Sequence, residues 1–239
     1  MSQLVAIHSL RLAPGELAEE VRRRFGQPLR REGDFARLCL AGLAAGLAEA
    51  GVACQGRRNG LIYGSGAGAS QETQRVLAEV AQERSLPMPF DFIASQPGVA
   101  AAHAARLPGS ITGATCMLST GALWEQMLTL SVLWLASGRY EQVLCGWVEP
   151  AQFGARPLHC SDWLLLAAAQ CSGPVLAQLE LAAPVPVVPQ LADEAAFLPT
   201  LDAWLKAGAQ TELAAPACGR VRWRRVEPTF PPPPSGGRG

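Results

Sequence analysis

Side chains that could act as nucleophiles, bases or metal ligands are sparse in this sequence of 239 residues, and few are spaced as motifs. The seven cysteines stand singly, at positions 39, 54, 116, 145, 160, 171 and 218. Because no CxxC pair is present, the sequence predicts neither a zinc knuckle nor a thioredoxin-type site. We therefore expect no metal ion and no cofactor.

The three histidines, His8, His103 and His159, could serve as bases only beside suitable neighbours. His159 is followed by Cys160 and Asp162, which could indicate a hydrolase or a metal site, but no third ligand is spaced nearby. We interpret this grouping as a chance pairing in a loop beside a strand. His103 lies in an alanine-rich helix, where we expect it to pack and not to act as a base.

Two further segments have features of binding or catalytic motifs. The segment 64–70 (GSGAGAS) lies between an expected strand and an expected helix, as phosphate-binding loops do. It lacks the lysine of Walker A and the GxGxxG spacing, so we interpret it as a tight turn. Ser119, Thr120 and Gly121 could form a nucleophile elbow, but the GxSxG frame and an acid–histidine pair are missing.

The composition restricts the class of protein. Hydrophobic residues make up 49% of the chain and charged residues only 17%, below the roughly 25% of a typical soluble domain. The 20 basic and 20 acidic side chains balance, which argues against nucleic acid as the main partner because that binding needs a basic surface. We expect a cytoplasmic protein with no membrane span, because no apolar run reaches about 18 residues.

Alternating strands and helices must position these candidate residues. Hydrophobic spacing predicts strands at 3–9, 61–66, 109–120, 142–149, 163–170 and 175–182, the last two as a hairpin. The same signals, with their Gly, Pro and capping residues, predict helices at 16–26, 34–50, 70–84, 97–106, 121–137 and 194–206. An edge strand is predicted at 219–227 and a disordered Pro/Gly tail at 228–239.

This alternation predicts an α/β fold with layered helices on a mixed, mostly parallel five-stranded sheet. The helix at 121–137 is apolar around most of its circumference, so we expect it to be buried on all sides. Residues 184–227, rich in Pro and Ala, could cover the open face of this helix within one domain spanning 1–227. If they do not, another subunit must do so.

The order of elements resembles the N-terminal half of β-ketoacyl synthases over roughly residues 3–182. The segments that carry the resemblance are FARLCLAGLAAGLAEAGV, LIYGSGAG, SQETQRVLAEVAQE, IASQPGVAAAHAARLPGSIT, SGRYEQVLCGWVEP and SDWLLLAAAQCSGPVLAQLEL. Within that family, the chain looks most like the short chain length factors of aryl polyene clusters, which also stop after the first half. The resemblance implies a thiolase-like half as the fold.

The resemblance also implies where a catalytic cysteine would stand. In ketosynthases it begins the buried central helix, and counting back from Gly138, which ends that helix here, leads to Gly121. The local sequence LSTGALWEQ holds no cysteine, and the family's two catalytic histidines belong to a half that is not recognisable here. We therefore expect no catalytic residue in this chain, and no activity of the chain alone.

Cys116 is the alternative nucleophile, which would make the chain a small stand-alone acyltransferase or ketosynthase. It lies more than one helical turn upstream of Gly121, and a free cysteine is more often a buried structural residue. A decayed synthase with no ligand is a third hypothesis.

The function implied by the resemblance depends on partners. A chain length factor would form a heterodimer with a full-length, active β-ketoacyl synthase and support acyl-chain elongation in polyene or fatty-acyl biosynthesis. The residues that we expect at the subunit interface or along the acyl tunnel are Thr120, Gly121, Trp124 and Met127.

Arginines offer candidate sites for an acidic acyl carrier protein, which a basic strip would attract. The strip consists of Arg220, Arg222, Arg224 and Arg225. A second basic cluster lies within 22–31, and for both the simpler interpretation is a solvated surface.

Overall fold

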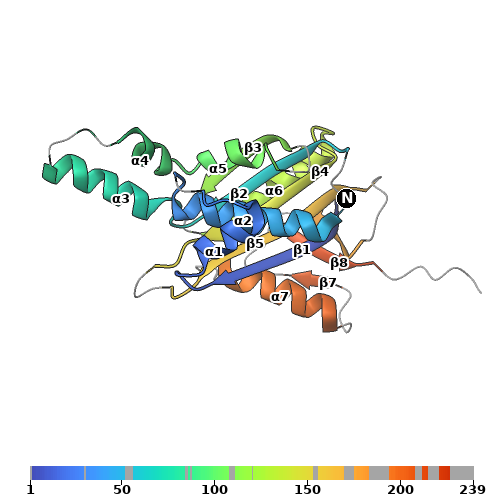
Figure 1. The fold of residues 1–239 in the computed structure, drawn as a ribbon. Coiled ribbons are helices and arrows are strands. Elements are labelled where there is room, and N and C mark those ends of the chain that lie inside the picture. The colour runs from blue at the N-terminus through green and yellow to red at the C-terminus, as the bar shows by residue number, and fades with distance from the viewer. Residues whose placement is uncertain are drawn as a thin grey trace, which may run out of the picture.

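Figure 1 shows the fold of this chain as a computed structural model, which describes residues 2–29, 31–51, 56–83, 86, 88–107, 111–119, 121–152, 156–169, 175–182, 194–207, 212–214 and 221–226. The strands are β1 (Ser2–Leu12), β2 (Asn59–Ser65), β3 (Ile111–Leu118), β4 (Gln142–Glu149), β5 (His159–Ala168), β6 (Ala177–Leu181), β7 (Glu212–Ala214) and β8 (Val221–Arg225). The helices are α1 (Leu17–Phe25), α2 (Asp34–Ala50), α3 (Ser70–Ala78) with the π-helical turn η2 (Glu79–Glu83), α4 (Pro89–Ala94), α5 (Val99–Ala104), α6 (Leu123–Ala136) and α7 (Glu194–Ala207). The tail predicted at 228–239 lies outside the described residues.

The eight strands of the described residues form one sheet, in the order β3-β2-β4-β5-β1-β6-β8-β7. Strand β2 is parallel to both of its neighbours, β3 and β4, whereas the other neighbouring pairs are antiparallel. The predicted mixed α/β class is confirmed, but the prediction of five mostly parallel strands is wrong. Residues 150–158, which join β4 to β5, are too few for the crossover of a dozen or more residues that a parallel pair needs.

Two predicted strand arrangements are also wrong. Strands β5 and β6 do not form a hairpin, because β1 lies between them and pairs antiparallel with both. Strand β8 is not at the edge, since it pairs with β6 on one side and with β7 on the other. The three residues of β7 are too short a run for hydrophobic alternation to reveal.

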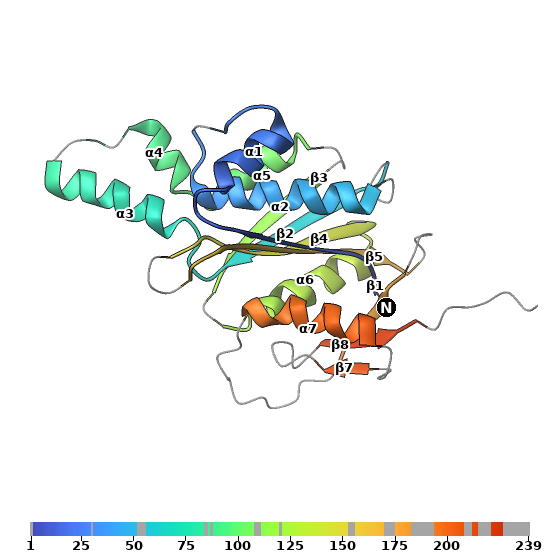
Figure 2. The same cartoon turned by 60° about the horizontal axis from the view of Figure 1, so that its bottom comes forward.

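Helices cover both faces of the sheet, as the edge-on view in Figure 2 shows. Helices α1, α2 and α5 lie on one side, called here the α2 face, and α6 and α7 lie on the other, called here the α6 face. Alternate residues of β5 serve the two cores: Trp163 and Leu165 pack on the α2 face, whereas Leu164 and Leu166 pack on the α6 face.

Helix α2 lies very close to the sheet because its sequence is rich in Ala and Gly. A Cβ added at Gly42 would lie 2.0 Å from Ser161 Oγ and 2.5 Å from Trp163 Nε1. A larger residue at this position would therefore push the helix off β5. The predicted helix at 34–50 is confirmed with its bounds, and Gly51 follows it with a positive φ of 56°.

Helix α6 is buried on the side that faces the sheet and α7. Its buried residues are Leu123, Trp124, Met127, Leu128, Ser131 and Leu135. Leu133, in contrast, is 54% exposed, so the described residues of this chain leave part of the outer face of α6 uncovered, and its predicted burial on all sides stays a prediction that depends on another subunit. Helix α7 supplies part of the cover, with the rings of Trp124 and Phe197 at a centroid separation of 4.7 Å.

Helices α3 and α4 extend beyond the sheet and form an arm that both views show clearly (Figures 1 and 2). The large apolar side chains exposed on this arm and its connection are Leu77, Val80, Leu86, Met88, Phe90, Phe92 and Ile93. The short helix α4 of this arm was not predicted from the sequence, and it begins at Pro89, a position where proline is tolerated. In the part of the chain that the structure describes, no helix is long and apolar enough to cross a membrane.

Candidate functional site

The three parallel strands β3, β2 and β4 end together beside the start of α6, which is where the sequence predicted the site. Gly121 and Ala122 form the turn into the helix, and Thr120 lies outside the described residues. Ala122 has a φ of 52°, and within the described residues it is the one non-glycine with positive φ. Such a sharp turn is typical of a strained functional loop. A Cβ added at Gly121 would meet nothing within 4 Å, so the turn has space for a larger side chain.

A carboxylate from α7 occupies the N-terminus of α6. The backbone N–H groups of Leu123 and Trp124 donate to Glu194 Oε1 and Oε2, at 2.8 and 3.2 Å. The Trp124 indole N–H donates to the Glu194 backbone carbonyl oxygen at 3.0 Å. A helix N-terminus favours a negative charge, and here the chain supplies that charge itself.

A second buried carboxylate occupies the turn after β2. Glu149, at the end of β4, accepts hydrogen bonds from the Ser65 hydroxyl at 3.1 Å, the Gly66 N–H at 2.8 Å and the Ala67 N–H at 3.0 Å. The N–H groups that could have bound a phosphate are therefore already satisfied. Residues 64–70 form the tight strand-to-helix turn that the sequence indicated.

The two larger residues expected at an interface or tunnel lie within the core of this chain. Trp124 and Met127 are fully buried on the α6 face. A Cβ added at Gly64 would lie 2.9 Å from Met127 Sδ, so the methionine packs tightly against β2. The structure brings both close to the turn at Gly121 but leaves neither exposed.

Cys116 lies on the opposite side of the sheet from α6. It packs against the core of the α2 face, beside Tyr63 of the neighbouring strand. Burial raises the pKa of the Cys116 thiol to about 11, although a hydrogen bond with Tyr63 acts in the other direction. A thiol in these surroundings stays protonated at neutral pH, which does not favour a nucleophile.

The histidine, cysteine and aspartate of β5 do not form a shared site. His159 Nδ1 accepts the Ala151 N–H at 3.0 Å, and burial lowers its pKa. Cys160 packs on the α6 face, and burial raises the pKa of its thiol. Asp162 is fully buried and accepts hydrogen bonds from Arg11 Nη2 at 2.8 Å and the Ser9 hydroxyl at 2.8 Å.

The other two histidines each pair with a glutamate. His8 Nδ1 lies 2.7 Å from Glu49 Oε1, and His103 Nε2 lies 3.1 Å from Glu32 Oε1. Among the residues that the structure describes, no group of three possible metal ligands comes together.

The arginines of the predicted carrier-protein strip differ in their exposure and in their partners. Arg220 lies outside the described residues. Arg222 and Arg224 are exposed on the same side of β8. Arg224 is partly neutralised by Glu212, at 3.2 Å. Arg225 donates to the backbone carbonyls of Trp204 and Leu205, so it caps the end of α7.

Sequence reasoning missed the two glutamates that define this region. Glu149 could have been noticed, because it follows a buried strand whose carboxyl end must meet the turn after β2. Glu194 carries no such signal, since it reaches the start of α6 from 71 residues further along the chain.

No protein-family model matches this sequence, and no curated protein shows a significant match to it. Solved structures do match. A chain in the structure of the ketosynthase ApeO in complex with its chain length factor ApeC, from Xenorhabdus doucetiae, aligns with a TM-score of 0.59 and 15% identity. The alignment covers 94% of this chain and 99% of that one.

Two further similar structures are the ishigamide ketosynthase/chain length factor, and a type II polyketide synthase acyl-carrier protein in complex with its ketosynthase (AntDE:AntF). Both align with a TM-score of 0.54, at 13% and 12% identity. The alignments cover 75% and 76% of this chain, and 67% and 69% of the matched chains. This chain therefore has the thiolase-like fold of the ketosynthase and chain length factor structures, as its sequence predicted.

Proposed function

We propose that this chain is a non-catalytic subunit of the chain length factor type, which pairs with an active β-ketoacyl synthase in acyl-chain elongation. The observation that carries the proposal is the Glu194 carboxylate on the N-terminus of α6. A synthase would need that helix end for its thiolate, and Gly121 provides no thiol. A nearby carboxylate would disfavour a second negative charge at the same place.

The length of the matched chain also supports a short partner subunit. The alignment with one chain of the ApeO–ApeC complex covers 94% of this chain and 99% of that one, whereas about a third of each of the other two matched chains lies outside the alignment. Because this chain aligns over nearly all of a short chain from a ketosynthase–chain length factor complex, we propose that elongation takes place in the partner.

The surface around β3 supports pairing with another subunit. Strand β3 ends the sheet, so one side of its backbone has no strand neighbour among the described residues. Leu118, at its end, is 56% exposed. The α3–α4 arm, which extends beyond the sheet, carries further exposed apolar side chains (Figures 1 and 2). An exposed apolar surface of this kind is typical of a protein interface.

Docking of an acyl carrier protein remains a further part of the proposal. Arg222 and Arg224 give β8 a basic outer side, which would attract an acidic partner. We propose a cytoplasmic location for the complex, together with polyene or fatty-acyl products.

Co-expression tests the pairing directly. The chain is expressed with a full-length ketosynthase from the same genome, and the complex is analysed by size exclusion with light scattering. We expect a 1:1 heterodimer that elongates an acyl primer with malonyl units, whereas the chain alone shows no elongation. A well-behaved monomer that ignores every synthase tested contradicts the proposal.

Two matched variants locate the interface. Leu118→Arg places a charge on the exposed end of β3 and should weaken the heterodimer at least tenfold, because an unpaired charge would be buried. Leu181→Arg is the control, since Leu181 is also an exposed strand-end leucine but lies on β6, away from the β3 edge. Equal weakening by both variants would contradict an interface at β3.

A further inference from the structure

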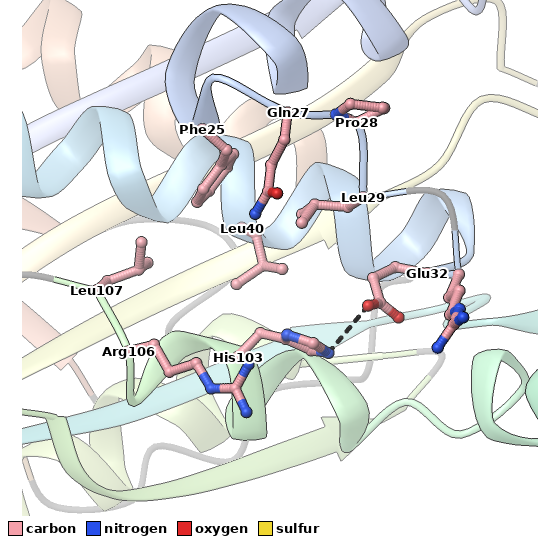
Figure 3. A pocket seen from close by; sticks show the side chains of 10 residues that line it. Phe25, Gln27, Pro28, Leu29, Glu32, Leu40, His103, Arg106 and Leu107 are labelled. Carbon is pink, nitrogen blue, oxygen red and sulfur yellow. Dashed lines mark ion pairs between the residues drawn. The ribbon is translucent and has the colours of Figure 1, made fainter.

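A cavity of about 600 Å³ opens on the α2 face, between the end of α1, the loop that follows it, α2 and α5 (Figure 3). This volume lies within the range of roughly 300–1,000 Å³ that is typical of small-molecule sites. The whole sheet separates the cavity from α6, and none of the residues discussed for the proposed function lines it.

The inner part of the cavity is apolar. Phe25, Leu29, Leu40 and Leu107 line it, and Leu40 of α2 is almost completely buried. In Figure 3 the Gln27 side chain points from the loop toward Leu40, so its amide faces the same space. A hydrocarbon chain or an aromatic ring would find apolar contacts here, with one amide available as a hydrogen-bond donor.

The rim of the cavity carries excess positive charge. His103 and Glu32 pair with each other at 3.1 Å, so the glutamate is already engaged. Arg31 stacks over the Phe90 ring at 4.4 Å, and no carboxylate of the described residues forms an ion pair with it. The Arg106 guanidinium makes no hydrogen bond or ion pair with any residue in the described ranges. Arginine remains charged at any ordinary pH, so this rim favours an anion.

We propose that this cavity binds a small organic carboxylate with an apolar body. Arg106 would hold the carboxylate, since the planar guanidinium matches a carboxylate with two parallel hydrogen bonds. The Gln27 amide would donate a further hydrogen bond, and the apolar body would lie against Phe25, Leu40 and Leu107. The cavity lies on the other face of the sheet from the start of α6, and its rim meets the α3–α4 arm where Arg31 stacks over Phe90.

Calorimetric titration of the full chain with octanoate tests the proposal. We expect saturable 1:1 binding, and octanamide, which has the same chain but no charge, should bind at least tenfold more weakly. Arg106→Gln should also weaken octanoate binding about tenfold, because it removes the charged anchor but leaves the apolar wall. Absence of saturable octanoate binding, or equal affinity for octanamide, would overturn the proposal.

Two further variants separate the site from general charge effects. Gln27→Glu places a carboxylate at an exposed position on the rim and should abolish octanoate binding without affecting folding, which circular dichroism verifies. Lys206→Gln removes one positive charge from α7, on the opposite side of the sheet, and should leave octanoate binding unchanged. If Lys206→Gln weakens binding as much as Arg106→Gln, the effect is one of net charge, and the proposed site is wrong.

Discussion

The start of α6 and the cavity on the α2 face differ in whether their anion-binding groups are already bound to carboxylates of the chain. At α6, the groups that could bind an anion are occupied by the chain itself, through Glu194 on the helix N-terminus and Glu149 on the turn after β2. In the cavity, Arg106 makes no ion pair within the described residues, and the one rim carboxylate, Glu32, is taken up by His103.

The start of α6 is the region where the sequence resemblance would place a catalytic cysteine, whereas the cavity on the α2 face is the region with donors available to a ligand. At the start of α6, the donors are bound to carboxylates of this chain and so stabilise the fold. In the cavity on the α2 face, the donors of Arg106 and Gln27 face an open space. Fold similarity therefore draws attention to the start of α6, whereas the hydrogen-bond partners show which of the two regions has donors available for a ligand.

The largest effect is expected at Glu149. Glu149→Ala would leave the Ser65 hydroxyl and the Gly66 and Ala67 N–H groups without their acceptor. Each unsatisfied buried donor costs about 1–3 kcal/mol, so we expect a loss of about 3 kcal/mol in the free energy of unfolding, measured with urea. The control is Glu49→Ala. The Glu49 carboxylate is exposed and pairs with His8, so this substitution should lower the free energy of unfolding by about 1 kcal/mol or less. Equal losses in the two variants would show that Glu149 is not a structural acceptor.

A smaller loss is expected for Glu194→Ala. It removes the acceptor for the N–H groups of Leu123 and Trp124 and the charge at the end of the helix, together worth about 2 kcal/mol. Glu194→Gln retains an acceptor oxygen and should lose about half as much. Asp202→Ala, on the same helix, breaks an exposed pair with Lys206 and should cost about 0.5 kcal/mol. If Glu194→Ala lowers the free energy of unfolding no more than Asp202→Ala does, the Glu194 carboxylate does not stabilise the N-terminus of α6.

Local patterns were sufficient for most elements of the fold but not for their neighbours in the sheet. The Ala/Leu-rich helix between Asp34 and Gly51 was predicted with its bounds, because capping and glycine signals are local. The position of β1 between β5 and β6 could not be predicted, since strand pairing depends on contacts between residues more than 150 positions apart. The same applies to β8, which looked like an edge strand until β7 was seen beside it.

The position of the turn before α6 could be predicted from the sequence, but the side chains that surround this turn could not. Gly121 does stand at a sharp turn before the buried helix, because the spacing from Gly138 is set along one continuous helix. Trp124 and Met127 were predicted to lie at the subunit interface or along the acyl tunnel, but both are fully buried in the core of this chain, because hydrophobicity alone does not distinguish an internal core from an interface. Glu194 was missed because a carboxylate that crosses from another helix leaves no spacing in the sequence.

A kinetic comparison tests the occupied helix N-terminus directly. Gly121→Cys places a thiol in the open space at the turn, beside the Glu194 carboxylate. Adding Glu194→Gln removes the negative charge beside the helix N-terminus, so the helix end should then stabilise the thiolate more strongly. We expect the double variant to react with iodoacetamide about threefold faster than the single variant at pH 7, from a helix-end effect of about 0.3–1 kcal/mol. Equal rates would mean that Glu194 does not control charge at this position.

The smallest effect is expected at Cys116, which tests whether the α2 face performs chemistry as well as binding. Because burial raises the pKa of its thiol to about 11, only about one thiol in a thousand is ionised at pH 8. Iodoacetamide should therefore label Cys116 very slowly at pH 8 and faster as the pH approaches 11, as peptide mass spectrometry would show. In the unfolded chain this thiol releases its proton near pH 9, whereas in the folded chain it does so near pH 11. The free energy of unfolding should therefore fall as the pH rises from 9 to 11. This fall should be less steep in Cys116→Ala, which lacks the thiol. Rapid labelling at pH 8, together with an acyl-transfer activity that Cys116→Ala abolishes, would instead make this chain an enzyme in its own right.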